Sequence, residues 1–158
     1  MTQHPLFAGL AACLVLAGAS VRAATATYDY DALGRLTKVT SSDGKVASYS
    51  YDAAGNRSQV VSGTLPGVPA SITVPASSST GNYTISWGAA SGTVTAYKLF
   101  QATNAGFSGE TQVYSGTALS VALTGRANGT YYYRVQSCLD VSCSGYRTGA
   151  NGVTVLKP

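Results

Sequence analysis

The chain has 158 residues and a net charge of +4, and charged side chains make up only 10% of it. Its ten Lys and Arg residues are scattered rather than gathered into a run, which excludes a basic track for nucleic acid. The single His, His4, lies near the N-terminus, and two thiols alone do not complete a structural zinc site. We therefore expect no nucleic-acid partner, no metal and no cofactor.

The first predicted element is an export signal at residues 1–23. Leu6 to Ala19 is almost wholly apolar, which is the length of a signal-peptide core and too short to span a bilayer. Small residues around Ala23 predict cleavage there, so the mature protein is expected to be secreted, periplasmic or at the cell surface, with no transmembrane segment. The residues before Cys13 match the loose pattern of a lipidated cysteine, but the apolar core continues past it, so lipidation is only the alternative.

Residues 24–61 contain a unit that repeats after 21 residues. The stretch Tyr28–Leu36 aligns with Tyr49–Arg57, and within each copy tyrosines alternate with Asp or Ser as in a strand. Asp and Gly follow each strand and predict a turn, and Asp43-Gly44 is a strong hairpin signal between the copies. The segment is therefore predicted to form two β-hairpins, with its aspartates capping turns rather than performing catalysis.

A Tyr-Asp pair followed by Gly-Arg or Gly-Asn, found twice in phase, resembles the YD repeat of the RHS family of bacterial surface and secreted proteins. The resemblance covers about residues 28–61 and implies carbohydrate or surface binding. Two hairpins also leave unpaired strand edges, which favour pairing of the repeat strands with a larger RHS-type protein. About three repeats are normally needed for stability, so a truncated remnant of a larger protein is the alternative.

Residues 62–69 are rich in Gly and Pro and predict a linker, and residues 70–158 have the length of a small β-sandwich. No helical period occurs in this segment, so the predicted fold class is all-β. Seven short β-rich runs are separated by turn residues. They are Ser71–Pro75, Tyr83–Gly88, Ala96–Thr103, Gln112–Ser115, Leu119–Leu123, Tyr131–Cys138 and Gly152–Leu156.

Trp87 at the end of the second run, Tyr97 and Leu99 on the third, and the run of tyrosines on the sixth resemble an immunoglobulin-like fibronectin type III domain. The resemblance implies a core that contains alternate residues of the sixth strand, namely Tyr131, Tyr133 and Val135, and a tyrosine corner at Tyr131. The intervening residues Tyr132 and Arg134 then face outward, next to Phe100 of the third strand. We take Phe100, Tyr132 and Arg134 as the candidate binding residues.

Cys138 and Cys143 are the cysteines that remain after cleavage of the signal, and they flank a short loop. In an oxidising compartment such a pair is expected to form a disulfide.

The sequence offers no catalytic site. Its one Glu, Glu110, has only Asp140 as a second carboxylate in the predicted sandwich, and His is absent from the mature chain. The function expected is therefore a non-catalytic binding or adhesion module, whose partner is a carbohydrate or another surface protein. The alternative is a structural spacer or remnant.

Overall fold

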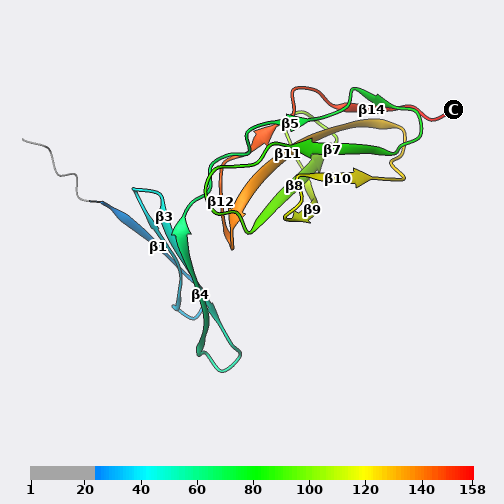
Figure 1. Ribbon diagram of the computed structural model, residues 1–158. Helices are drawn as coiled ribbons and strands as arrows, with labels where there is room; N and C mark the ends of the chain where they lie inside the picture. The colour runs from blue at the N-terminus through cyan, green and yellow to red at the C-terminus, as the bar shows by residue number, and fades with distance from the viewer. Residues whose placement is uncertain (1–23) are drawn as a thin grey trace, which may run out of the picture.

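A computed structural model describes residues 24–158, which fold into a four-stranded sheet followed by a β-sandwich (Figure 1). The predicted signal peptide and Cys13 lie outside the described residues. Within residues 24–158 every regular element is a strand, which confirms the all-β prediction. Over the same residues, no helix is long and apolar enough to cross a membrane.

The first sheet is an antiparallel meander of the two predicted hairpins, with strand order β1-β2-β3-β4. Its strands are β1 (Ala26–Tyr30), β2 (Leu36–Ser41), β3 (Lys45–Tyr51) and β4 (Arg57–Thr64). Because β4 continues to Thr64, the segment 62–69 predicted as a linker begins inside this sheet.

The repeated aspartates shape the turns of this sheet, as predicted. Oδ1 of Asp31 accepts the N–H groups of Leu33 and Arg35, both at 2.9 Å, and Oδ1 of Asp52 accepts the N–H of Asn56 at 2.8 Å. A glycine with positive φ follows each aspartate by three residues, at Gly34 and at the equivalent position of the second repeat. The two copies of the sequence motif therefore make two copies of the same turn.

The sandwich contains all seven predicted strands in two sheets, and three shorter strands that the sequence did not predict. The smaller sheet has the order β10-β7-β5, with β5 (Ile72–Thr73), β7 (Tyr83–Trp87) and β10 (Ser120–Leu123). The larger has the order β6-β14-β11-β8-β9, with β6 (Ser77–Ser78), β8 (Ala96–Ala102), β9 (Thr111–Gly116), β11 (Gly129–Leu139) and β14 (Val153–Val155). Two short strands also pair with β11, namely β12 (Ser142–Cys143) and β13 (Arg147–Thr148).

The core between the two sheets has the predicted faces. Tyr133 and Val135 on β11 are buried, together with Trp87 and Leu99. Tyr131 differs from the prediction, because its ring is only half-buried at the end of the sandwich. Its hydroxyl nevertheless donates to the carbonyl of Ala127 at 3.1 Å, which is the predicted tyrosine corner.

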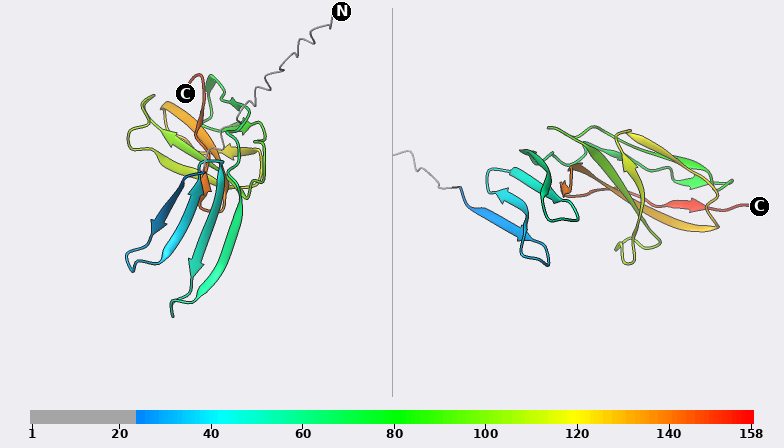
Figure 2. Two further views of the ribbon diagram at one scale, coloured as in Figure 1. Left: turned by 90° about the vertical axis from the view of Figure 1, so that its left-hand side faces the viewer. Right: turned by 90° about the horizontal axis from the view of Figure 1, so that it is seen from below.

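The four-stranded sheet adjoins the end of the sandwich at which β11 turns into β12 (Figures 1 and 2). A cavity between the two units is lined by Thr40 and Val46 of the sheet and by Val141 and Cys143 of the β11–β12 hairpin. Val46 is buried, and so is Leu139 of the hairpin. The sheet thus gains part of its core from the sandwich.

Candidate binding surfaces

The predicted binding residue Arg134 lies at the centre of a cluster on the outer face of β11. Its guanidinium carbon is 3.8 Å from the ring centroid of Tyr146 and 4.6 Å from that of Phe107. Arg134 also makes two hydrogen bonds to the carboxylate of Glu110, one of them from Nε at 2.7 Å, and this pairing raises the pKa of Arg134. The guanidinium is therefore held by two aromatic rings and one carboxylate of the protein itself.

The other two predicted binding residues lie on the same face. Phe100 is directly opposite Arg134 across β8 and β11, and its ring meets that of Tyr146 edge-on at 5.6 Å. Tyr132 lies opposite Ala102, two residues along the strand from Arg134. The structure therefore brings Phe100 and Arg134 together, but around Tyr146 and Phe107, which are not among the predicted binding residues.

The two carboxylates considered for catalysis lie far apart. Glu110 is bound to Arg134, whereas Asp140 lies six residues further along at the hairpin end of β11. At about 3.3 Å per residue, this places roughly 20 Å between Arg134 and Asp140 along the strand. A pair of glycosidase carboxylates lies within about 10 Å.

A second surface, which we call the open face, is the side of the four-stranded sheet turned away from the β11–β12 hairpin. It follows from the strand register, since alternate residues of each strand point to opposite sides. Tyr28 lies opposite Val39, Val39 opposite Ala47, and Tyr49 opposite Val60. Tyr28 is 56% exposed and Val60 is 47% exposed, so the open face presents aromatic and aliphatic groups to solvent.

A groove of about 420 Å³ crosses β2, β3 and β4 on this sheet. The side chains that line it on the open face are mostly small, aliphatic or hydroxyl-bearing. They are Val39, Ser41, Lys45, Ala47, Ser62 and Thr64. Further along the same sheet, the guanidinium carbon of Arg35 lies 4.5 Å from the ring centroid of Tyr51, and that of Arg57 lies 5.9 Å from Tyr49.

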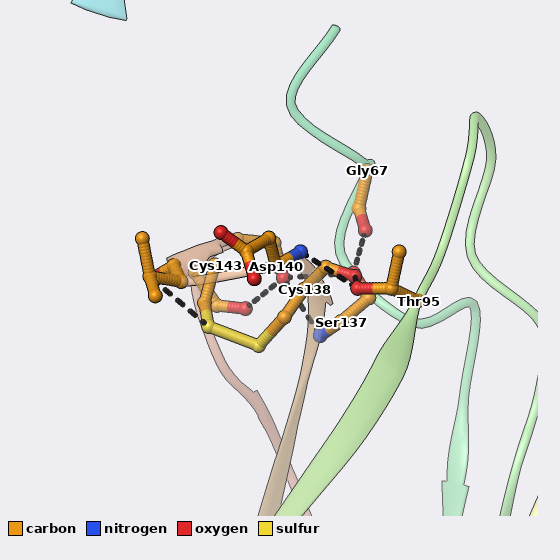
Figure 3. The surroundings of a disulfide bond; sticks show 9 residues. Gly67, Thr95, Ser137, Cys138, Asp140 and Cys143 are labelled. Atoms are coloured by element: carbon orange, nitrogen blue, oxygen red, sulfur yellow. Dashed lines mark hydrogen bonds between the residues drawn. A yellow bond between two sulfur atoms is a disulfide. The ribbon is translucent and has the colours of Figure 1, made fainter. Parts of the chain in front are cut away.

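Around Thr40 and Val46, the opposite side of the sheet is covered by the β11–β12 hairpin. A disulfide closes this hairpin (Figure 3). Cys138 pairs directly with Cys143 across the two strands, with a Cα–Cα distance of 4.0 Å, which confirms the predicted disulfide. Asp140 adopts a positive φ of 55° in the turn, and its N–H donates to Oγ1 of Thr95 at 2.6 Å. Ser137 Oγ donates to the carbonyl of Gly67, so the hairpin is also tied to the segment that follows β4.

Comparison with protein families supports the reading of the repeats. The model of the RHS repeat family matches residues 25–64, so this segment is an RHS repeat segment. No curated protein matches the chain.

Two of the solved structures to which the chain is similar are described as fibronectin type III or fibronectin-like. A segment of two fibronectin type III domains from chicken tenascin is 14% identical, with a TM-score of 0.47 over 71% of this chain and 62% of the segment. A fibronectin-like protein from Clostridium thermocellum is 22% identical, with a TM-score of 0.43 over 60% of this chain and 93% of that chain. A cytokine receptor complex is 16% identical, with a TM-score of 0.40 over 76% and 79% of the two chains. The chain thus spans less than two thirds of the tenascin segment.

Proposed function

We propose that this chain, an RHS repeat segment joined to a fibronectin type III-like sandwich, is a non-catalytic exported binding module. Its ligand lies on the open face of the repeat sheet, and the sandwich acts as the scaffold. The observation that carries the proposal is the difference between the two sides of the sheet. One side is covered by the disulfide hairpin around Thr40 and Val46, whereas the other exposes Tyr28 and Val60 beside a groove.

The chemistry of the open face favours a carbohydrate chain as the ligand. The groove has an aliphatic floor at Val39 and Ala47 and hydroxyl groups at its rim, and Lys45 is the one charged residue that lines it. Tyrosine rings nearby offer flat apolar faces with a polar tip. A neutral sugar chain presents both the apolar ring faces and the hydroxyl groups that such a surface accommodates.

The Arg134 cluster is the less favoured ligand site because its side chains already bind one another. Its guanidinium already stacks on Phe107 and Tyr146 and already pairs with Glu110, so a ligand would have to displace these contacts. The same pairing occupies Glu110, the one Glu of the sequence, which supports the non-catalytic reading. The disulfide is typical of an oxidising compartment and supports export.

The test is a binding screen of the purified protein against glycans and cell-wall polysaccharides, repeated with three variants. Tyr28→Ala removes an exposed ring of the open face, and Tyr49→Ala removes a ring of the same face on β3, two strands away. Each is expected to weaken binding by about fivefold or more, the scale of one aromatic contact. Phe100→Ala on the sandwich is the control and is expected to leave affinity unchanged. Loss of binding in Phe100→Ala alone would move the site to the sandwich.

A spacer is the second candidate function. The observation that favours it is the contact of the hairpin with the sheet, which fixes the two units to one another. If the chain is a spacer, it should bind no glycan in the screen. Deletion of the sandwich should then displace the repeat segment from its place on the larger RHS-type protein.

A further inference from the structure

The four-stranded sheet ends in two free edges. Strand order leaves β1 at one edge and β4 at the other, and neither has a second neighbour among the described residues. β4 is eight residues long, six of them exposed, and it carries no charge between Arg57 and its end. An edge of this length, with its one charged residue at the end and no proline, is a template for pairing with another strand.

The repeat makes the two edges complementary to one another. β1 reads Ala-Thr-Tyr-Asp-Tyr and the matching residues of β3, 47–51, read Ala-Ser-Tyr-Ser-Tyr. β2 and β4 are related in the same way, with Val39 matching Val60. β4 therefore presents to an incoming strand the same kind of edge that β2 presents to β3, and β1 is a close copy of β3.

We propose that a second copy of this chain adds its β1 to the free edge of β4. The strands run antiparallel, as β2 and β3 do, and the sheet continues from one copy into the next. This goes beyond the proposed ligand binding and does not depend on it. It would also repeat the open face along the assembly, which raises avidity for a repetitive ligand.

The register follows from the observed pairing of β2 with β3. There Val39 lies opposite Ala47 and Lys38 opposite Ser48. A shift of one repeat places Val60 opposite Ala26 of the second copy and Gln59 opposite Thr27 of the second copy. In each of these pairs the two side chains lie on the same side of the extended sheet.

The exposure of the tyrosines favours a copy of this chain as the occupant. Tyr49 and Tyr51 on β3 are half-buried, and the hydroxyl of Tyr51 donates to the carbonyl of Leu36 on β2 at 2.8 Å. Their equivalents on β1, Tyr28 and Tyr30, are 56% and 60% exposed because β1 has no strand on its outer side. Pairing of β1 with β4 of another copy gives Tyr30 the contact that Tyr51 already has.

Such a contact joins two different edges, so it leaves a free β1 at one end and a free β4 at the other. A head-to-tail interface of this kind produces open chains of copies unless the rotation closes a ring. The assembly should therefore grow with protein concentration rather than stop at a dimer.

Disulfide trapping tests the register. Protein carrying Ala26→Cys is mixed with protein carrying Val60→Cys under mild oxidation, and mass spectrometry is expected to find the mixed 26–60 link between chains. Val61→Cys replaces Val60→Cys in the control, because it lies one residue away on the other side of the sheet, and little link is expected. A dominant 60–60 link would show β4 pairing with β4, and absence of any link would overturn the proposal.

A charge pair tests the same contact without cysteines. Thr27→Lys with Gln59→Lys places like charges opposite one another only in the assembly, whereas Thr27→Glu with Gln59→Lys places opposite charges there. Sedimentation velocity over a concentration series should show association at least about fivefold weaker in the first variant than in the second. Equal association of the two variants would refute the register. A wild-type chain that stays monomeric would refute the self-association, while ligand binding by that monomer would leave the proposed function intact.

Discussion

Gly63 of β4 lies directly against Leu139 of the sandwich hairpin. A Cβ added at position 63 would be 2.8 Å from Cδ2 of Leu139, closer than two carbons approach one another. Leu139 is 4% exposed at this place. The repeat sheet and the sandwich therefore meet where the sheet has no side chain, and the leucine fills the space.

A large side chain at position 63 should separate the two units. We expect Gly63→Leu to destabilise the repeat sheet by about 1–3 kcal/mol, the usual cost of overpacking. Hydrogen exchange of the β1–β4 amides should then accelerate while the sandwich is unchanged. Ser62→Leu adds the same group on the open face and serves as the control. Equal acceleration in both variants would mean that the contact with Leu139 contributes nothing.

The disulfide should matter more for the hairpin than for the sandwich. Only four residues separate Cys138 and Cys143, so the stabilisation should lie near the low end of about 2–4 kcal/mol. Cys138→Ser with Cys143→Ser should leave a folded sandwich but loosen the hairpin that covers the sheet. Thiol labelling of the denatured, unreduced mature protein should find no free thiol, and two reactive thiols would contradict the bond.

The faces of β11 can be tested by two neighbouring tyrosines. Tyr133 is 1% exposed, and its hydroxyl donates to Oε1 of Gln101 at 2.8 Å and lies 2.7 Å from that of Tyr83. Tyr133→Ala should therefore cost about 3–5 kcal/mol. Tyr132→Ala, on the outer side of the strand, should cost less than half as much. Chemical denaturation measures both, and the reverse order would mean that the strand is shifted by one residue.

Acid should weaken the repeat sheet through its turns. Hydrogen bonds and the nearby Lys45 lower the pKa of Asp43 to about 2, and backbone hydrogen bonds lower the pKa values of Asp31 and Asp52. Because the folded pKa lies below the unfolded one, the stabilisation is present above about pH 4 and is lost as the pH falls toward 2. NMR or hydrogen exchange of β1–β4 across this range measures the loss.

Asp31→Asn with Asp52→Asn is the control for this pH effect. The amide oxygens still accept the turn hydrogen bonds but no longer titrate, so the dependence between pH 4 and 2 should become shallower. An unchanged pH profile in this variant would assign the effect to other groups.

The parts of the fold that could be predicted from the sequence are those that depend on residues close together in the chain. The turns at Asp31 and Asp52 depend on side-chain bonds to the backbone a few residues away, so the motif itself contains the information. The seven sandwich strands were predicted from β-rich runs between turn residues, whereas β6, β12 and β13 are two-residue strands that lie outside such runs.

The binding surfaces were harder to predict because they depend on contacts between distant segments. Phe107 and Tyr146 lie in loops without periodicity, so nothing in the sequence indicated that they enclose Arg134. The covering of one side of the repeat sheet depends on Leu139, far along the chain from Gly63. Only the fold shows which side of the sheet remains open.

The most direct test of the central claim is hydrogen exchange of the full chain with and without soluble cell-wall polysaccharide. The claim is that the open face of the repeat sheet binds the ligand and the sandwich supports it. We expect the polysaccharide to slow exchange in β2, β3 and β4 and to leave β8 and β11 unchanged. Protection confined to β8, β11 and the loop around Phe107, or no protection in any strand, would contradict it.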